Sequence, residues 1–594
     1  MNHKAVSLLV ILLLPLLFSF CGNGKSDRNV KPNILLITVD TLRRDHLGVY
    51  GYPRETSPYL DELAKKSLRF TNVITPIPLT APSHASILTS LHPLTHGLNI
   101  NGGILDQKVQ TIAEVLKQNG YYTMGAVGVK ILSSGYQFSQ GFDTFSDSWG
   151  IKKKNHTAYE RTAPSVNESI FEQIDTYLTG PEQNRKPLFI WVHYFDPHFP
   201  YHDQENVTFK NKLLKNEDRK GMRLYDKEIV YTDAHIKKLL DYLAEKNLNK
   251  HLLTCITSDH GEEFGEHGHV NCHVDFYSET TFVPLILNGY GVPKNKAVDT
   301  YVSTMDIAVT LLAAANLSFD YPCEGVDLLK IAKNPENYKE RKFFILGDPF
   351  SIRSLQLLGH PYGYILNLDN HLKYWYVSSD LDNPGPTIDE TRFTPIPKGN
   401  IKPVNDHAFT VTLPRDEINV LKYAILRADV KHNKGTYIRM KLWPNAQTDR
   451  VAFTRPIKHF TIILPAAFPD QIQAIITFKP GTRLDNVRYT YISKKEFHQM
   501  GEFKEKKKNN MFAQLLTQRK KKSLDEFYDL AGDIAMEHNL AAEKQFKPII
   551  AKYKKIIYNV YSYYQQKGKK LLQGMKIQEL TDEDKKMLES LGYL

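Results

Sequence analysis

The chain has 594 residues, of which 42% are hydrophobic and 24% charged, a composition that excludes intrinsic disorder. This length exceeds what one hydrophobic core organises, so we expect a large domain and a smaller one. Four cysteines without CxxC spacing argue against a zinc ribbon and a disulfide framework. The net charge of +11 is concentrated towards the C-terminus, and no motif typical of nucleic-acid binding accompanies it.

The N-terminal segment carries an apolar run, residues 6–20, between Lys4 and Cys21. The run matches the core of a signal peptide and is shorter than a comfortable membrane span. Cys21 with the polar tether 21–31 resembles a bacterial lipoprotein signal, although Phe20 replaces the usual small residue. We therefore expect a signal peptide (1–20), a lipidated Cys21 and an extracytoplasmic, membrane-anchored protein of the cell envelope. Simple cleavage and an uncleaved anchor are the alternatives.

Residues 32–40 form a β-rich apolar run that ends in Asp40, which is typical of a buried parallel strand. Three helix-then-strand pairs follow at 111–119 and 121–127, 167–178 and 188–193, and 227–243 and 252–259. This alternation predicts an α/β fold with a mostly parallel sheet and helices on both faces. Ligands of such sheets bind at the carboxyl ends of the strands, where Asp40 and Asp259 stand.

Two motifs follow these strands. Residues 78–90 read P-L-T-A-P-S-H-A-S-I-L-T-S, and residues 257–268 read T-S-D-H-G-E-E-F-G-E-H-G. They resemble the sulfatase signature C/S-x-P-S-R-x-x-x-L-T-G and the family's T-S-D-H-G-E-x-x-G-E-H-G. Further matches at 225–233, 302–312 and 527–540 extend the resemblance to the sulfatase family, a branch of the alkaline-phosphatase superfamily, over nearly the whole chain. It implies a sulfatase-like catalytic domain and a smaller C-terminal α+β subdomain.

The chain departs from the family pattern at three positions. Thr80 stands where sulfatases carry the cysteine or serine that is oxidised to formylglycine; oxidation of threonine would give a ketone, so no formylglycine is expected. Thr41 follows Asp40 where most sulfatases have a second aspartate, and His84 replaces the arginine of the signature. Phosphoryl-transferring relatives in the superfamily use a threonine or serine as nucleophile, so Thr80 favours phosphate or phosphonate esters over sulfate esters.

The resemblance implies one divalent metal site formed by Asp40, Asp259, His260 and the hydroxyl of Thr80. An imidazole ligand favours manganese or zinc, with calcium and magnesium as alternatives. Such a cation would support Thr80 as a partial alkoxide and neutralise one oxygen of the ester.

Four further residues are candidates for catalysis. His198 matches the family histidine on the leaving-group side and is assigned to substrate binding or general-acid work; His273 is the second choice for that acid. His84 either orients Thr80 or has a structural role at a helix start. Lys130 aligns with the family's G-K-x-H segment or is a surface lysine.

A second metal is a minority alternative to the single site. Its ligands would be Asp196, His198, His202 and His273.

We expect a catalytic domain over residues 32–345 and a C-terminal subdomain over 346–594. Residues 372–377 resemble the strand that in this family lies shortly before the element found here at 527–530. The interval between them alternates like strands, for example at 407–412, 437–442 and 474–478, and predicts a β-rich insertion at about 378–503. A basic linker (504–522) and terminal helices follow. Residues 546–564 carry apolar side chains at helical spacing, which indicates a helix docked on the body, with a membrane-surface helix as the alternative.

The leading hypothesis is a sulfatase-family, metal-dependent hydrolase of sulfate- or phosphate-type esters with Thr80 as nucleophile. The alternatives are a sulfatase that works without formylglycine, a phospho-group transferase on envelope components, and an inactive sulfatase-fold protein that binds polyanions. The partner would be an anionic ester, glycan-borne or lipid-linked, and not a nucleic acid.

Overall fold

The computed structural model describes residues 30–148, 159–204, 207, 209, 221–267, 270–273, 276–338, 344–347, 354–359, 362–367, 377–378, 391, 394–396, 401–405, 408–412, 422–431, 437–443, 449–452, 459–466, 473–477, 483–493, 526–572 and 587. The expected signal peptide, Cys21 and the basic linker 504–522 lie outside them. Within the described part of the chain, no helix combines the length and apolar character needed to cross a bilayer.

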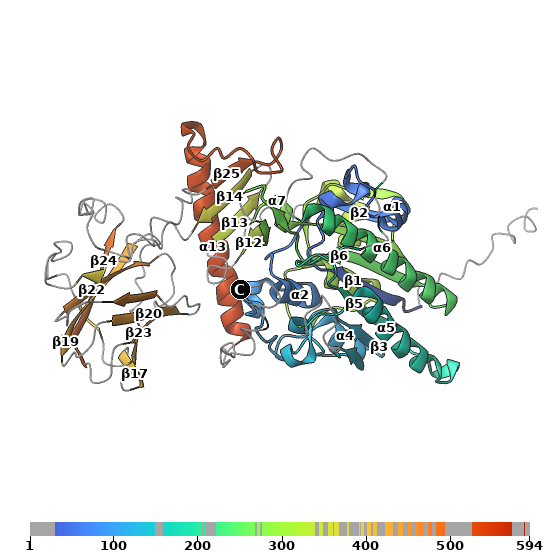
Figure 1. Ribbon diagram of the computed structural model, residues 1–594, viewed down its shortest axis with the longest axis horizontal. Coiled ribbons are helices and arrows are strands. Elements are labelled where there is room, and N and C mark those ends of the chain that lie inside the picture. The colour runs from blue at the N-terminus through green and yellow to red at the C-terminus, as the bar shows by residue number, and fades with distance from the viewer. Residues whose placement is uncertain are drawn as a thin grey trace, which may run out of the picture.

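The larger, N-terminal part of the chain is built on a nine-stranded sheet in the order β10-β2-β9-β6-β1-β5-β3-β4, with β11 paired to β2 (Figure 1). Its central strand β1 (Asn33–Val39) is parallel to β5 (Leu188–Tyr194) and β6 (Leu252–Ser258), whereas β9 (Phe282–Gly289) runs antiparallel to β6 and β2. The other strands are β2 (Leu68–Ile74), β3 (Tyr122–Ala126), β4 (Thr144–Ser146), β10 (Lys296–Val298) and β11 (Val302–Ser303). The predicted, mostly parallel sheet is confirmed.

Helices cover both faces of this sheet because its strands are apolar on both sides. In β1, Ile34 and Leu36 pack into one core, and Leu35 and Ile37 into the other. The first core holds α2 (Thr80–Thr89), α4 (Ile112–Gln118), α8 (Asp306–Ala314) and α9 (Leu328–Lys333). The second holds α1 (Pro58–Lys65), α5 (Ala163–Leu178) and α6 (Met222–Glu245), on the opposite side in Figure 1. The helices expected near 111–119, 167–178 and 227–243 are α4, α5 and α6.

A smaller antiparallel sheet follows in the order β12-β13-β14-β25. Its strands are β12 (Phe344–Leu346), β13 (Ser354–Gly359), β14 (Tyr362–Asn367) and β25 (Glu526–Asp529). The long helix α13 (Lys547–Leu571) lies along this sheet (Figure 1), with Tyr553 and Ile557 buried against Leu94 and Phe527. The apolar stripe of α13 therefore docks on the body, as expected from its spacing.

Between β14 and β25 the chain forms two five-stranded sheets, ordered β15-β22-β19-β24-β16 and β17-β18-β23-β20-β21. All their strand pairs are antiparallel. The expected strands near 407–412, 437–442 and 474–478 are β18 (Ala408–Thr412), β20 (Tyr437–Trp443) and β23 (Gln473–Thr477). The boundaries given above for the β-rich insertion stay a prediction. Residues 372–376 lie outside the described residues, and the strand that pairs with β25 is β14.

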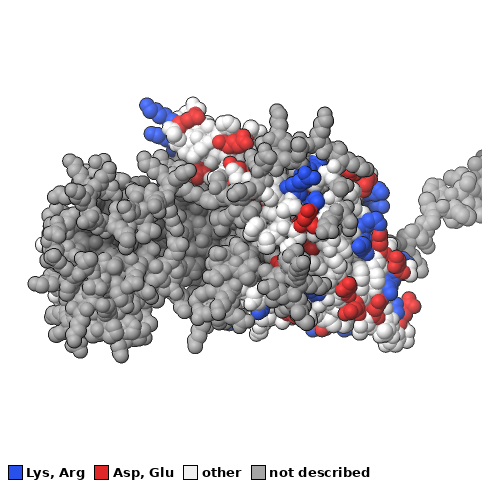
Figure 2. Space-filling model, in the orientation of Figure 1, with Lys and Arg blue, Asp and Glu red and all other residues white. Residues whose placement is uncertain are grey.

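Basic and acidic side chains are interspersed over the described part of the face drawn in Figure 2. On that face, neither sign of charge dominates around the catalytic domain. Residues 501–525, which include the expected basic linker, lie outside the described residues.

Candidate active site and metal centre

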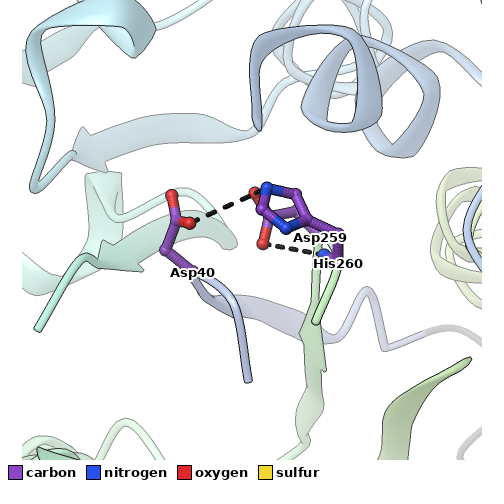
Figure 3. A group of neighbouring side chains, drawn as sticks. All are labelled: Asp40, Asp259 and His260. Carbon is purple, nitrogen blue, oxygen red and sulfur yellow. Dashed lines mark hydrogen bonds and ion pairs between the residues drawn. The ribbon is translucent and has the colours of Figure 1, made fainter. Parts of the chain in front are cut away.

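The ends of β1 and β6 bring three potential metal ligands together (Figure 3). Val39 pairs with Ser258 in the parallel ladder, so the next residues, Asp40 and Asp259, leave the sheet side by side. One ligand atom each from Asp40, Asp259 and His260 lies within 4.8 Å of the others, and all three residues are buried. This is the strand-end geometry at which α/β sheets bind their ligands.

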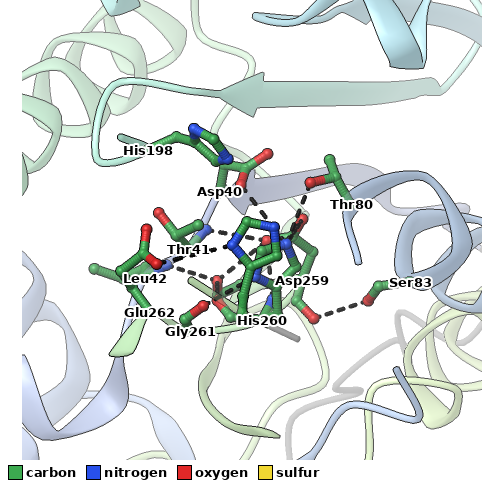
Figure 4. A network of polar contacts seen from close by, with 12 residues as sticks. Asp40, Thr41, Leu42, Thr80, Ser83, His198, Asp259, His260, Gly261 and Glu262 are labelled. Carbon is green, nitrogen blue, oxygen red and sulfur yellow. Dashed lines mark hydrogen bonds and ion pairs between the residues drawn. The ribbon is translucent and has the colours of Figure 1, made fainter. Parts of the chain in front are cut away.

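Thr80 joins this group from the first residue of α2 (Figure 4). Its hydroxyl lies 3.2 Å from Nε2 of His260. Two contacts fix the start of α2: the Ser83 hydroxyl donates to the carbonyl of Asp259 (2.8 Å), and the Ala81 N–H donates to Oδ1 of Asn101 (2.9 Å). The structure therefore brings the four expected ligands into one cluster.

The electrostatics of the cluster suit a cation. Both carboxylate oxygens of Asp40 and Oδ2 of Asp259 are buried without a satisfied hydrogen bond. Burial, with Asp259 and Glu262 nearby, raises the pKa of Asp40 well above its usual value, and burial raises the pKa of Asp259. Adjacent buried carboxylates with oxygens that lack donors are costly unless they are protonated or bound to a positive ion. The residues present thus fit a divalent metal.

The tautomer of His260 agrees with a role as ligand. Its Nδ1 lies 3.0 Å from the carbonyl of Gly261, which can only accept, so Nδ1 carries the proton. Nε2 is then the lone-pair nitrogen, 3.4 Å from Oδ2 of Asp259 and 3.9 Å from Oδ1 of Asp40. Burial and His273 lower the pKa of His260, which keeps the ring neutral, as metal ligation requires.

Thr41, at the position of the family's second aspartate, holds the loop and points its side chain elsewhere. Its φ is +52°, an uncommon conformation for a β-branched residue. The Thr41 N–H donates to Oδ1 of Asp259 (3.2 Å), and its hydroxyl donates to the carbonyl of Pro197 (3.0 Å). Thr41 thus connects the metal-ligand cluster to the loop that carries His198.

His84, in place of the family's arginine, is buried beside Thr80. Its Nδ1 lies 2.8 Å from the carbonyl of Thr80 and 3.5 Å from Oδ2 of Asp259. Burial lowers its pKa, although Asp259 opposes this. His84 is therefore a neutral neighbour of the cluster, which favours the expected role of orienting Thr80.

His198 and His273 lie on one side of the cluster. The ring of His273 is 4.5 Å from that of His260 and 5.6 Å from that of His198. His198 donates from Nδ1 to the carbonyl of Phe199 (2.5 Å), so Nε2 is its proton-exchanging nitrogen. Burial and His273 lower the pKa of His198, so it is neutral before an anionic ester arrives. Both histidines are placed for contact with a leaving group, and their roles stay predictions.

The other sequence-derived candidates have these contacts. The Nζ of Lys130 lies over the ring of Tyr159, 5.0 Å from its centroid. Asp196 accepts from the N–H of Ala163 at the start of α5 (3.0 Å), and the N–H of His202 donates to Glu228 (2.7 Å). Among the described residues, the Asp40 group is the one potential metal cluster found, so the two-metal alternative gains no support.

Sequence reasoning missed His193, which lies 3.3 Å from Asp40 through Nε2, and the buried Glu262. His193 belongs to an apolar run that reads as a buried strand. The available signal was the strand register, since His193 stands opposite Thr38, two residues before Asp40.

Comparison with known proteins agrees with this geometry. Residues 32–317 match the family model described as Sulfatase. An ulvan-active sulfatase of Formosa agariphila is 29% identical over 367 residues, which cover 55% of this chain and 70% of the relative. An arylsulfatase of Clostridium perfringens is 26% identical over 377 residues, covering 50% and 78%.

The fold has its own parallel among solved structures. A putative sulfatase of Bacteroides thetaiotaomicron superposes with a TM-score of 0.54 at 14% identity, covering 93% of this chain and 96% of that one. Residues 32–317, which carry the site, are thus similar to the sulfatase family of hydrolases, and the fold is that of a solved sulfatase-like structure.

Proposed function

We propose that this protein is a metal-dependent hydrolase of sulfate- or phosphate-type esters that uses Thr80 as its nucleophile and favours phosphate or phosphonate esters. One observation carries the proposal: the Thr80 hydroxyl lies 3.2 Å from His260, in a group with two buried carboxylates of which three oxygens have no hydrogen-bond partner. Asp40, Asp259 and His260 would hold the cation, with the Thr80 hydroxyl as a further ligand. Manganese or zinc suits this mixed oxygen and imidazole set.

The side chains have separate tasks in such a reaction. When bound, the cation lowers the cost of an alkoxide at Thr80 and withdraws charge from an ester oxygen. Oγ1 of Thr80 bonds to phosphorus while the bond from phosphorus to the leaving oxygen breaks. The Thr80 proton passes to solvent. His198 takes up a proton at Nε2 as the anionic ester binds and gives it to the leaving oxygen, with His273 as second choice for this acid. Water then cleaves the ester at Thr80 and restores its hydroxyl, releasing a phosphate monoester from a diester substrate or a phosphonate from a phosphonate monoester.

The charge of the site favours a monoanionic ester. Two carboxylates offset one divalent cation, and burial holds the pKa values of His84, His198 and His260 below the ordinary value. A phosphate diester, a phosphonate monoester or a sulfate ester carries one negative charge, whereas a phosphate monoester carries about two near neutral pH. We expect the first group to have the higher kcat/KM.

The test is turnover of aryl phosphate diesters, phosphate monoesters and sulfates with manganese or zinc, together with a search for a phosphorylated Thr80 peptide. We expect phosphorylated Thr80 in the wild type, loss of about 1,000-fold or more in turnover for Thr80→Ala, and partial activity for Thr80→Ser. Turnover of sulfates alone, unchanged in Thr80→Ala, would overturn the mechanism.

Three alternatives remain separable. The names of the relatives support a sulfatase that works without formylglycine, which would turn over sulfate esters alone. A phospho-group transferase on envelope components would move the phospho group to an acceptor molecule, whereas a hydrolase would release it to water. The third alternative is an inactive sulfatase-fold protein that binds polyanions. It would be supported if elemental analysis finds no metal in a protein that still binds polyanions. The substrate is proposed to be an anionic ester on a glycan or lipid, met outside the cytoplasm by a protein anchored through Cys21.

A further inference from the structure

Two buried histidines lie against the two metal-binding carboxylates. His193, on β5, places Nε2 3.3 Å from Oδ2 of Asp40, and His84, on α2, places Nδ1 3.5 Å from Oδ2 of Asp259. The two rings meet edge to face with their centroids 4.8 Å apart. Both side chains are fully buried, so their proton positions are set by protein neighbours.

The neighbours of His193 determine its tautomer. The backbone N–H of Gly128 points at Nδ1 over 3.3 Å, and a backbone N–H can only donate. Nδ1 is therefore the lone-pair nitrogen, and in the neutral ring the proton lies on Nε2. That nitrogen lies 3.3 Å from Oδ2 of Asp40, close enough for a contact although not aligned as a hydrogen bond.

A second chain of contacts determines the tautomer of His84. The carbonyl of Thr80 can only accept, so Nδ1 of His84 carries the proton. Trp191 donates from Nε1 to the Thr38 hydroxyl (3.1 Å), which leaves that hydroxyl to donate to Nε2 of His84 (3.0 Å). The Nδ1–H of His84 is thus directed between Thr80 and Asp259.

We propose that His193 is a positioning residue of the metal site, whose Nε2–H orients Asp40 through Oδ2, while Oδ1 of Asp40 faces His260. A neutral N–H can restrain the outer oxygen of a carboxylate while leaving its negative charge for the cation; a lysine or arginine would neutralise that charge. Partners of metal ligands at this distance fix ligand orientation and contribute to metal affinity.

Gly128 forms part of this arrangement because a side chain at its position would be tightly packed against β5 and the loop that follows it. A Cβ there would lie 3.0 Å from Cβ of Phe195 and 3.1 Å from the carbonyl of His193. Without a Cβ, the backbone approaches β5 closely enough to donate to the ring.

The inference rests on the proposed metal site, and the experiment separates the two. The full chain is stripped of metal, and its dissociation constant for Mn²⁺ is measured by equilibrium dialysis alongside its thermal unfolding. His193→Gln keeps an amide N–H near the position of Nε2. His193→Asn carries the same group but reaches only towards Nδ1, and His193→Phe keeps a ring without donors. His235→Phe, at a buried histidine on α6, is the matched control.

We expect Mn²⁺ binding to weaken about 10- to 100-fold in the Asn and Phe variants. The Gln variant and the His235→Phe control should stay close to the wild type. Equal affinity in all His193 variants, or equal losses in Gln, Asn and Phe, would overturn the positioning role. A wild-type protein that binds no metal would instead overturn the proposed function.

Discussion

Tyr225 fixes the backbone of Thr41: its hydroxyl donates to the Thr41 carbonyl (2.7 Å) and accepts from the N–H of Arg43 (2.8 Å). The ring is fully buried on α6. One hydroxyl from the helix layer thus anchors the loop that follows Asp40, so the loop after β1 depends on a residue far from it in sequence.

Tyr225→Phe should lower the free energy of unfolding by about 1–3 kcal/mol, because it leaves a buried carbonyl and a buried N–H unpaired. Urea unfolding of the metal-free chain measures the loss. Tyr177→Phe is the control, since its hydroxyl donates to the Lys186 carbonyl in an exposed setting; it should change stability by less than about 0.5 kcal/mol. Equal effects would contradict the assignment.

The positive φ of Thr41 gives a second prediction. Thr41→Ala and Thr41→Gly both lose the hydroxyl bond to Pro197, but only glycine has no Cβ penalty at φ +52°. The glycine variant should unfold with a free energy about 1 kcal/mol higher than the alanine variant. An alanine variant as stable as the glycine variant would show that the conformation carries no strain.

Asp40→Asn should have opposite effects with and without metal. Without metal it removes one of two adjacent buried carboxylates whose pKa values are raised, so the variant should melt at a higher temperature than the wild type. With excess Mn²⁺, only the wild type should gain stability. Differential scanning calorimetry with and without a chelator checks both signs, and Asp241→Asn on the surface of α6 is the control. If Mn²⁺ raises the melting temperature of Asp40→Asn as much as that of the wild type, Asp40 is not a metal ligand.

Glu228 makes stability depend on pH. Burial, with Asp196 nearby, raises its pKa to about 9, and it accepts from the N–H of His202 and from Gln204. The folded state therefore keeps a proton that the unfolded state releases near pH 4.5. The contribution of Glu228 to stability is fully present below about pH 4.5 and is lost as the pH rises towards 9. The free energy of unfolding, measured from pH 5 to 9, should fall less steeply with pH in Glu228→Gln than in the wild type. Equal slopes in the two proteins would refute this.

The lipid anchor is tested at Cys21. Expressed with its leader in a bacterium, the wild type should incorporate labelled palmitate and sediment with membranes, because several acyl chains together bind a bilayer stably. Cys21→Ser should lack the label and appear in the soluble extracytoplasmic fraction, and Cys323→Ser should behave like the wild type. An unlabelled wild type would contradict the anchor.

The metal-ligand cluster could be predicted from sequence because its members follow apolar strands or begin a helix next to a recognisable motif. Parallel pairing of β1 with β6 makes Asp40 and Asp259 neighbours without further information. Asp196 and His202 share the loop of His198, yet their partners are Ala163 and Glu228, which only the tertiary packing reveals. Spacing along a loop therefore did not indicate which of its side chains reach the cluster.

The contacts of His193 and Thr41 were hidden for different reasons. The side-chain direction of His193 depends on strand register, and its tautomer depends on Gly128 from a separate strand connection. The backbone angle of Thr41 is held by two hydrogen bonds with distant residues: Tyr225 on α6 donates to its carbonyl, and its hydroxyl donates to the Pro197 carbonyl. No local sequence pattern could indicate these contacts.

The pairing of β14 with β25 has a consequence for biosynthesis. β14 is made early, but its partner strand is translated only after both five-stranded sheets have been synthesised. Until then, the outer edge of β14 exposes unpaired backbone groups on the ribosome, the kind of edge that recruits foreign strands. The edge of β14 is therefore covered only when β25 has been made. A chain truncated before β25 should be prone to aggregate.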